Sequence, residues 1–378
     1  MQIKKPTIVL ITHTNPLKKS GGVEYNALMK INHFAEQGYN VITISPRRKS
    51  KIGLVTFTLN HTTFPFPITL QFAINLVKFF KVTNIYIEHL LNWNKNIETL
   101  THFVENHKAP KTLFLHDLHF RCTHPHCDVN GKYCGAMNQG FDKSQCTTCP
   151  NGGGKLTTHH QCFIKFMEMS RKIVFPSQFL MDFYNKFFAN KFAKKTITHP
   201  IQHLHNTNIP SNSSKINGKI KIAFIGVSCQ HKGYQHFLEL AKNSSLKNNY
   251  EFYVIGSKIR NQDDKQFIKN IITNYRTDNI PSILQNNSIN IAFLFSQVPE
   301  SYSFTMHEAI ASCIPIITSN MSGNIHSQIA NNSVYGRVFE DINDVIKLLS
   351  NKDGTLKFIA DNPNKHLYSP TLNTLFAS

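Results

Sequence analysis

Residues 289–318 read INIAFLFSQVPESYSFTMHEAIASCIPIIT, and this stretch decides the fold. The run Ile289–Leu294 is short and apolar, as in a buried strand, and a second such run follows at Pro315–Thr318. Between the two runs a helix is predicted to begin near Thr305. A strand, a helix and a further strand in this order are typical of a parallel sheet with helices packed against it.

The same alternation of strand and helix fills both halves of the chain. In the first half an amphipathic helix is predicted at Val23–Gln37, and Gly38 ends it as a C-terminal glycine does in many helices. In the second half a helix is predicted at Tyr234–Lys242. Further strands are predicted at Thr7–Ile11, Val41–Ile44, Ile85–Ile87, Thr112–Leu115, Lys172–Phe175, Ile220–Ile225 and Glu251–Ile255. We therefore predict an α/β protein with two doubly wound, Rossmann-like domains.

A polar stretch at residues 206–214 interrupts the pattern with the Asn, Ser and Pro content of a linker. We predict an N-terminal domain at residues 1–204, which contains a Cys-rich insert at 122–149. A C-terminal domain is predicted at 205–360. Residues 361–378 are expected to form a tail that packs back on the N-terminal domain.

Ligands of open α/β sheets bind outside the carboxyl ends of the strands. Two such sheets that face each other would form a cleft. We expect it to be lined by the loops at 12–22, 88–93, 116–121, 226–233 and 296–305. The sequence shows no G-x-G-x-x-G fingerprint and no P-loop lysine motif, so redox chemistry on a nucleotide cofactor and P-loop chemistry are disfavoured.

The chain is strongly basic, with 41 Lys and Arg against 22 Asp and Glu and a formal charge of +19. This charge favours nucleic acid, an anionic membrane face or phosphorylated small molecules as partners, and a Lys-rich soluble surface would also account for it. The apolar run Ile8–Ile11 is too short for a secretory signal, and no stretch approaches the ~20 apolar residues of a membrane span. We expect a cytoplasmic protein with reduced thiols, in peripheral contact with the inner face of the cell membrane.

The segment Glu300–Ala309 follows a predicted strand and opens a helix, so its backbone N–H groups would suit a diphosphate. Glu300 can accept hydrogen bonds from sugar hydroxyls, and Glu308 can hold a ribose diol. The structural alternative is a capping box, Thr305-x-x-Glu308, in which Glu308 only satisfies a backbone amide. Spacing alone does not decide between these two interpretations.

This segment resembles the E-x7-E signature of family 4 glycosyltransferases, a large retaining group with the GT-B fold. The resemblance continues through residues 309–317 and the glycine turn at Ser322–Ile325, although Cys313 stands where glycine is usual. It implies that Glu300 contacts the donor sugar and Glu308 the ribose. The residues that it assigns to the phosphates are Ser303, Phe304 and Thr305.

The loop Gly226–Gly233 carries Lys232, a compact cation that suits a leaving diphosphate, although an isolated lysine is more often a surface charge. The loop is similar to the Lys-Gly element of the same family. Val227 stands where that family commonly has an arginine just after the strand glycine. We interpret this departure as a subfamily trait, and weakened catalysis is the alternative.

Elements of the first half resemble the family as well. Gly21 and Gly22, which alone would predict only a turn and a helix start, are similar to its GG-x-E loop beside the donor phosphates. His116, just after a predicted strand, resembles its cleft histidine near the transferred sugar. On the acceptor side we expect Glu88, His89 and Asp117.

Five of the eight cysteines lie in one segment of low apolar content, at Cys122, Cys127, Cys134, Cys146 and Cys149. The pair Cys146 and Cys149 has the C-x2-C spacing that lets two thiolates bind one tetrahedral zinc ion. In a reducing compartment we expect a structural zinc held by four of the five, with disulfides, redox chemistry or free thiols as alternatives. Similar inserts occur in some bacterial members of the family.

The resemblance as a whole implies a hexosyltransferase-type glycosyltransferase with His116, Lys232 and Glu300 as catalytic residues. It would transfer a sugar from a nucleotide-sugar donor to a glycan or lipid-linked saccharide acceptor, with retention and without a catalytic cofactor. The implied process is the synthesis of a cell-surface polysaccharide or lipopolysaccharide.

Three other functions compete with this one. The first is a degenerate GT-B protein that binds sugar nucleotides, and the second is a phosphorylase or epimerase of GT-B type. The third is a basic, zinc-containing nucleic-acid-binding protein. The basic residues are spread along the chain without an aromatic-interleaved stripe or a known reader motif, so nucleic acid is not the expected partner.

Overall fold

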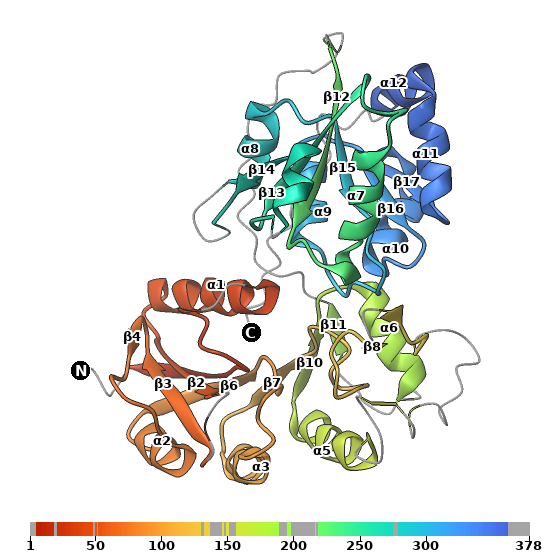
Figure 1. Cartoon of the computed structure of the whole chain (residues 1–378). Coiled ribbons are helices and arrows are strands. Elements are labelled where there is room, and N and C mark those ends of the chain that lie inside the picture. Colours follow the sequence, from red (N-terminus) through yellow and green to blue (C-terminus); the bar gives the residue numbers. More distant parts are fainter. Residues whose placement is uncertain are drawn as a thin grey trace. The chain divides into compact units, whose positions relative to one another are not determined.

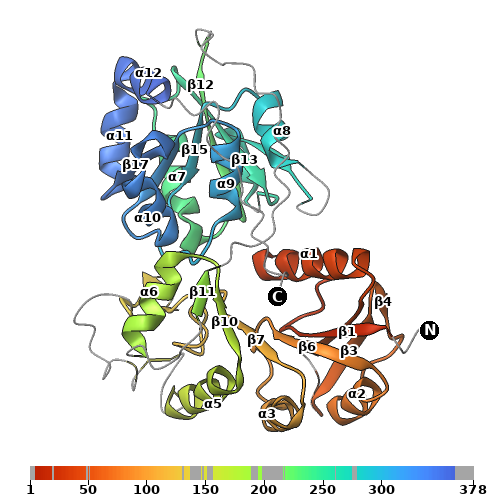
Figure 2. The same ribbon diagram turned by 180° about the vertical axis from the view of Figure 1, so that it is seen from behind.

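The computed structural model describes residues 5–361 except for 19–20, 48–49, 51, 130–131, 137–145, 147–148, 151–155, 189–194, 198–215, 217, 260 and 275–278. The chain forms two compact units (Figures 1 and 2). The first is built mainly from Met1–Cys127 and Gly135–Gln202, and the second mainly from His203–Thr371. The predicted linker at 206–214 and, apart from Asp361, the predicted tail lie outside the described residues.

The first unit is built on a nine-stranded sheet with the order β11-β10-β7-β6-β1-β2-β3-β4, in which β5 also pairs with β3. From β11 to β2 neighbouring strands are parallel, and β3 joins β2 in the antiparallel sense. The strands are β1 (Pro6–Ile11), β2 (Asn40–Pro46), β3 (Leu54–Leu59), β4 (Thr62–Thr63), β5 (Ile68–Thr69), β6 (Lys81–Ile87), β7 (Lys111–Phe114), β10 (Lys172–Phe175) and β11 (Lys195–Ile197). The winding direction reverses between β1 and β6, so the carboxyl ends of these two strands form a switch point.

Helices cover both faces of this sheet. Helix α1 lies on one face, and α2, α3 and α5 lie on the other (Figures 1 and 2). The helices are α1 (Gly22–Glu36), α2 (Leu70–Val77), α3 (Ile97–Asn106), α5 (Leu156–Met169) and α6 (Gln178–Phe187). Helix α1 confirms the helix predicted at Val23–Gln37, and Gly38 beyond it has a φ of 85°. A separate hairpin in the Cys-rich segment pairs β8 (Asp128–Val129) with β9 (Lys132–Tyr133).

The second unit contains a six-stranded, fully parallel sheet with the order β14-β13-β12-β15-β16-β17. This is the doubly wound 3-2-1-4-5-6 order, with its switch point between β12 and β15. The strands are β12 (Ile220–Gly226), β13 (Tyr250–Gly256), β14 (Ile268–Ile272), β15 (Ile291–Leu294), β16 (Ile316–Ser319) and β17 (Gly336–Phe339). The helices are α7 (Tyr234–Lys242), α8 (Ile280–Asn286), α9 (Phe304–Ala311), α10 (Asn324–Asn331), α11 (Ile342–Ser350) and α12 (Lys352–Ala360), with 3-10 turns η1 (Gln230–Lys232), η2 (Gln262–Gln266) and η3 (Ser333–Tyr335).

The second sheet has a packed core on both faces, which explains why its central strands are mainly apolar. Along β12, Ile222 and Phe224 belong to one core layer, and Ala223 and Ile225 belong to the other. The first layer includes residues of α7, α11 and α12, and the second includes residues of α8, α9 and α10. Because both faces are packed, the loops at the carboxyl ends of β12 and β15 are held on a rigid base. Among the described helices of the whole chain, none has the length and apolar character needed to cross a membrane.

Candidate functional site

The switch point of the second sheet holds an ion pair between Lys232 and Glu300. Lys232 Nζ lies 2.6 Å from Glu300 Oε1, and Ser296 Oγ lies 2.9 Å from the same oxygen. The Lys232 side chain is 40% exposed and that of Glu300 12%. Two residues that were predicted from separate motifs are therefore in direct contact, at an edge that solvent and a ligand can reach.

The loop that carries Lys232 is tied to the end of β15. The backbone N–H of Gln297 donates to the carbonyl of His231 at 2.8 Å. Gly233 has a φ of 81°, and a Cβ atom there would lie 2.1 Å from the carbonyl oxygen of Phe295. Only glycine fits this close approach, so the Gly that follows Lys232 is required by geometry.

The backbone of Glu300 is fixed by the turn that follows β16. The Glu300 N–H donates to the Ser322 carbonyl at 3.3 Å, and the Asn324 N–H donates to the Glu300 carbonyl at 2.8 Å. Between them Gly323 has a φ of 63°, and a Cβ there would lie 2.7 Å from the Glu300 nitrogen. The glycine turn noted in the sequence therefore positions the carboxylate that pairs with Lys232.

Helix α9 begins directly after this loop, and its cap is Ser303. The Ser303 hydroxyl accepts from the Met306 N–H at 3.1 Å and lies 3.0 Å from the Thr305 hydroxyl. Because the helix begins at Phe304, Thr305 is its second residue and is not the N-cap. The interpretation of Thr305 and Glu308 as a capping box is therefore wrong.

Glu308 is the fifth residue of α9 and is buried, with 8% of the residue exposed. Cys313, after this helix, has a φ of 54°. This left-handed conformation explains why glycine suits the position. Val227, where an arginine was considered, is 55% exposed and brings no charge to the loop.

The corresponding edge of the first sheet holds a buried charged cluster. Both oxygens of Glu88, directly after β6, lie 2.7 Å from Lys30 Nζ on α1. Glu88 Oε2 also lies 3.0 Å from Nε2 of His116, which follows β7. All three side chains are less than a tenth exposed. Sequence reasoning missed Lys30, although its place between Ala27 and Phe34 on the apolar stripe was a usable signal.

Burial and the neighbouring charges together determine the pKa shifts of this cluster. Burial alone would raise the pKa of Glu88, but Lys30 and His116 together hold it below its usual value. Burial lowers the pKa of Lys30 to about 8 despite the opposing effect of Glu88. Burial also lowers the pKa of His116, against the opposing effect of Glu88. Glu88 is therefore an ionised hydrogen-bond acceptor in a closed environment.

A second polar group lies next to this cluster. His89 Nε2 and Asp117 Oδ2 are 2.8 Å apart, and the charge and hydrogen bond of His89 keep the pKa of Asp117 well below its usual range although burial opposes this. The His89 ring lies 4.6 Å from the ring of His13 and 5.1 Å from that of His119. The structure therefore brings the predicted pair His89 and Asp117 together.

The glycine pair Gly21 and Gly22 stands at the start of α1. Gly21 is the N-cap, and its extended φ of −170° places no special demand on glycine. Glu24 in the first turn lies 3.2 Å from His13 Nε2 and accepts a 3.0 Å hydrogen bond from Thr14. Although burial opposes it, the hydrogen bond and charge of His13 lower the pKa of Glu24 to about 2.

The cysteine segment is partly described. All eight cysteines of the chain are outside disulfides. A hydrogen bond from Cys127 is the largest cause that lowers the pKa of the Cys122 thiol to about 6. Cys146 Sγ lies 3.8 Å from the guanidinium of Arg121. Within the described ranges no group of three or more His, Cys, Asp or Glu could hold a metal ion, and the zinc site stays a prediction.

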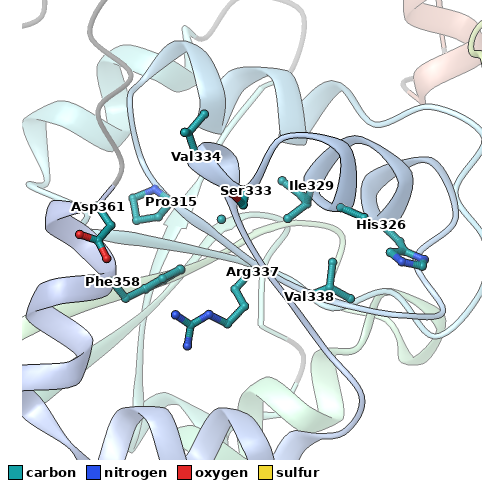
Figure 3. Close-up of a pocket in the computed structure, with 11 residues that line it drawn as sticks. Pro315, His326, Ile329, Ser333, Val334, Arg337, Val338, Phe358 and Asp361 are labelled. Atoms are coloured by element: carbon teal, nitrogen blue, oxygen red, sulfur yellow. The ribbon is translucent and has the colours of Figure 1, made fainter.

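A cavity of about 390 Å³ opens at the other end of the second sheet (Figure 3). Its lining includes Pro315 before β16, Gly336 at the start of β17, and Arg337, Phe358 and Asp361. Arg337 lies 5.5 Å from the Phe358 ring. Because this cavity is at the amino ends of the strands, it is separate from the Lys232–Glu300 site.

Comparisons with known proteins bear on the fold and on the class of the second unit. Residues 206–362 match the family model described as Glycosyl transferases group 1, which indicates a glycosyltransferase domain in the second unit. A search of curated protein sequences gave no match.

Solved structures resemble the whole chain. Sucrose-phosphate synthase from Thermosynechococcus elongatus has a TM-score of 0.59 at 10% identity, over 96% of this chain and 94% of that one. HepE of Anabaena in complex with UDP-glucose has a TM-score of 0.58 at 12% identity, over 95% and 93%. WaaG, a glycosyltransferase involved in lipopolysaccharide biosynthesis, has a TM-score of 0.53 at 12% identity, over 94% of each chain. At these identities the likeness shows the fold alone, and it confirms the predicted GT-B class with two Rossmann-like domains.

Proposed function

We propose that the protein transfers a hexose from a nucleotide-sugar donor to a glycan or lipid-linked saccharide. The observation that carries this proposal is the contact of Lys232 with Glu300. Glu300 precedes helix α9, and both residues lie in the region that matches the glycosyltransferase model. HepE, a protein of similar fold, has been solved with UDP-glucose, which supports a nucleotide sugar as the donor here.

The reaction breaks the anomeric C–O bond and leaves negative charge on the β-phosphate of the donor. In our proposal Lys232 and the first N–H groups of α9 stabilise this charge, because a helix N-terminus attracts anions. Glu300 holds hydroxyls of the transferred sugar, and Glu308 holds the ribose. The residues assigned to the phosphates are Ser303, Phe304 and Thr305.

The pairing of Lys232 with Glu300 has a consequence for donor binding. When the diphosphate arrives, Lys232 would turn from the carboxylate to the phosphate, which leaves Glu300 available for the sugar. Because Lys232 is partly exposed, breaking its ion pair with Glu300 should cost little free energy. Ion pairs in contact with solvent contribute only about 0–1 kcal/mol to stability. No metal is required in this scheme. We further propose retention of configuration, with the leaving phosphate helping to deprotonate the acceptor.

We assign roles to residues of the first unit as well. We assign His116 to the transferred sugar and the His89–Asp117 pair to the acceptor. Gly21 and Gly22 open α1 without bulky side chains, which suits close approach by a phosphate or a sugar. WaaG is described as acting in lipopolysaccharide biosynthesis, and we place this protein in a similar cell-surface process.

The direct test is nucleotide release from a panel of UDP-, GDP- and ADP-sugars, with and without lipid-linked oligosaccharide. We expect one donor to give acceptor-dependent release, and Lys232→Ala to lower the rate of release by about 10²- to 10³-fold without loss of folding. Binding of DNA or RNA at physiological salt together with no binding of any sugar nucleotide would overturn the proposal.

A degenerate sugar-nucleotide binder is the second candidate, and Val227 favours it. The side chain at this position is exposed and apolar, so it adds no cation to Lys232. A binder would show donor affinity by calorimetry but no release with any acceptor. Introducing Val227→Arg would then separate the two: an active enzyme should gain little, whereas a binder that lacks only this cation should gain transfer.

We also propose peripheral contact with the inner face of an anionic membrane, through the surface around α2. Phe66, Phe72 and Phe79 are exposed there, with 62%, 48% and 66% of each residue accessible. The sequence has no Asp or Glu between Glu36 and Glu88. The cations in that stretch are Arg47, Arg48, Lys49, Lys51, Lys78 and Lys81. Exposed aromatic side chains in a stretch of sequence with unbalanced positive charge suit an anionic lipid surface.

This contact can be measured by co-sedimentation with vesicles that contain an anionic phospholipid. The triple variant Phe66→Ser, Phe72→Ser, Phe79→Ser should lose most of the binding. The matched control is Ile272→Ser in the second unit, an equally exposed apolar residue that should leave binding unchanged. Equal binding of the triple variant and the native chain would count against the surface.

A further inference from the structure

The Lys30–Glu88–His116 cluster differs from an ordinary ion pair because it is closed off from solvent. Glu88 is 0% exposed and Lys30 is 1% exposed. The Lys30 ammonium also lies 3.2 Å from the centroid of the Phe114 ring, and that ring stacks on His116 at 5.9 Å and 7°. Such a buried ion pair is weak evidence for stability, because desolvation offsets most of its attraction.

The hydrogen bond between His116 and Glu88 fixes which ring nitrogen carries the proton. Glu88 is ionised, so its Oε2 can only accept. The His116 Nε2 that lies 3.0 Å away must therefore be the donor. In a neutral imidazole the other nitrogen, Nδ1, is then the acceptor.

The charge count determines whether the imidazole is neutral. A carboxylate beside a histidine normally favours the imidazolium form. Here the charge of Glu88 is already balanced by Lys30, at 2.7 Å to each oxygen. A proton added to His116 would leave one uncompensated positive charge in a closed site, which is costly.

We infer that Lys30 and Glu88 are positioning residues that hold His116 as a neutral imidazole with its proton on Nε2. This inference rests on the proposed function only for the effect on activity, which follows from the assignment of His116 to the transferred sugar. The lowered pKa of His116 agrees with it. Glu88 then acts through His116, which differs from the direct acceptor contact expected from the sequence.

Among the described residues, the other titratable groups that act on His116 do not change the charge count. His89 comes from the same loop as Glu88 and is paired with Asp117, the residue after His116. Its charge would lower the pKa of His116 further. Tyr86 on β6 is kept neutral, because burial raises its pKa to about 12. The state of His116 is therefore determined mainly by Lys30 and Glu88.

The test uses two variants that change charge and hydrogen bonding separately. Lys30→Met leaves Glu88 without its cation, so His116 should become an imidazolium, with its pKa raised by roughly 1–3 units. The acid limb of the pH profile of kcat/KM should move upward by the same amount. The double variant Lys30→Met, Glu88→Gln removes both charges but keeps an acceptor for the Nε2 proton. The acid limb of its kcat/KM profile should therefore lie at the same pH as in the native protein.

The matched control is Lys242→Met, which removes a lysine from an ion pair with Asp264 in the second unit. It should leave the pH profile unchanged. If Lys30→Met lowered activity equally at all pH values and the double variant did not restore the profile, the pair would be structural only.

A readout that needs no activity separates this inference from the proposed function. Long-range 15N–1H spectra of histidine-labelled protein, assigned with His116→Gln, report the tautomer and charge of His116 directly. We expect the neutral Nε2–H form in the native chain at neutral pH and the imidazolium in Lys30→Met. An Nδ1–H tautomer or an imidazolium in the native chain would overturn the inference. The expected spectra without any transfer activity would instead reject the proposed function.

Discussion

The two sheets carry the same pair of residue types at the same topological position, in opposite environments. Lys232 and Glu300 lie at the switch point of the second sheet, and Lys30 and Glu88 lie at that of the first. The N–O distances are nearly equal, at 2.6 and 2.7 Å. The Lys232 side chain is 40% exposed, whereas that of Lys30 is 1% exposed. We call Lys232–Glu300 the open pair and Lys30–Glu88 the closed pair. In the open pair the lysine can leave the carboxylate for a ligand, whereas the closed pair can only determine the protonation state of its neighbour, His116.

The largest expected effect tests the closed pair. Glu88→Leu leaves a buried ammonium without a counter-charge and should lower the free energy of unfolding by about 3–5 kcal/mol. Urea unfolding followed by circular dichroism measures this change. The double variant Lys30→Met, Glu88→Leu should recover most of the loss, because replacing both charges by apolar groups is often nearly neutral. If Glu88→Leu were as stable as the native chain, the Lys30–Glu88 pair would not differ from the exposed Lys232–Glu300 pair in its effect on stability.

The second prediction concerns the open pair. Lys232→Ala should lower kcat by about 10²- to 10³-fold, because it removes a charge that the leaving diphosphate needs. The same substitution should change the free energy of unfolding by less than ~1 kcal/mol. Steady-state transfer kinetics and urea unfolding of one sample give both values. Lys242→Ala, which also removes a part-exposed lysine, is the control and should leave kcat unchanged.

Much of the fold was predictable, because local patterns determine it. The helix predicted at Val23–Gln37 lies at Gly22–Glu36, and the strand predicted at Pro315–Thr318 lies at Ile316–Ser319. The strand β3 at Leu54–Leu59 was not predicted. Its burial alternates over Leu54–Phe57, its sequence alternates with threonines, and it runs antiparallel to β2 near the edge of the sheet. It therefore lacks the continuous apolar run that is typical of buried parallel strands.

The candidate sites were predictable only in part, because their contacts join distant segments. Lys232 and Glu300 were both named from their own motifs, but nothing in either motif gives the 2.6 Å contact across 68 residues. Lys30 was missed because the helix pattern was used to find apolar residues only. Its partner Glu88 is 58 residues away and was assigned to the acceptor, since burial cannot be read from a strand end.

A third prediction tests how rigidly the open pair is held. Gly233 and Gly38 have similar φ angles, 81° and 85°, but only Gly233 lies against other atoms. Gly38→Ala should cost about 1 kcal/mol from its backbone conformation alone. Gly233→Ala should cost roughly 1–3 kcal/mol more, because its Cβ would lie 2.1 Å from the Phe295 carbonyl and the loop must move. It should also raise KM for the donor, and equal costs at both sites would show that the loop adapts freely.

The smallest expected effect concerns Glu24, whose pair with His13 is intermediate, with both side chains 13% exposed. Its pKa falls from 4.5 to about 2 on folding, so the unfolded state binds its proton more readily. The stabilisation is therefore complete above pH 4.5 and is lost as the pH falls towards 2. Glu24→Gln should lower the free energy of unfolding by about 1–2 kcal/mol at neutral pH and by progressively less in acid.

Urea unfolding of the native chain and Glu24→Gln across this pH range gives the difference directly. Glu239→Gln is the control, since its contact with His236 is long, at 3.7 Å, and exposed. It should change the free energy of unfolding by less than ~0.5 kcal/mol. A difference for Glu24→Gln that stays constant into acid would mean that shape, not charge, holds the start of α1. In that case only the fully buried carboxylate at this edge of the first sheet, Glu88, would contribute to the free energy of unfolding through its charge.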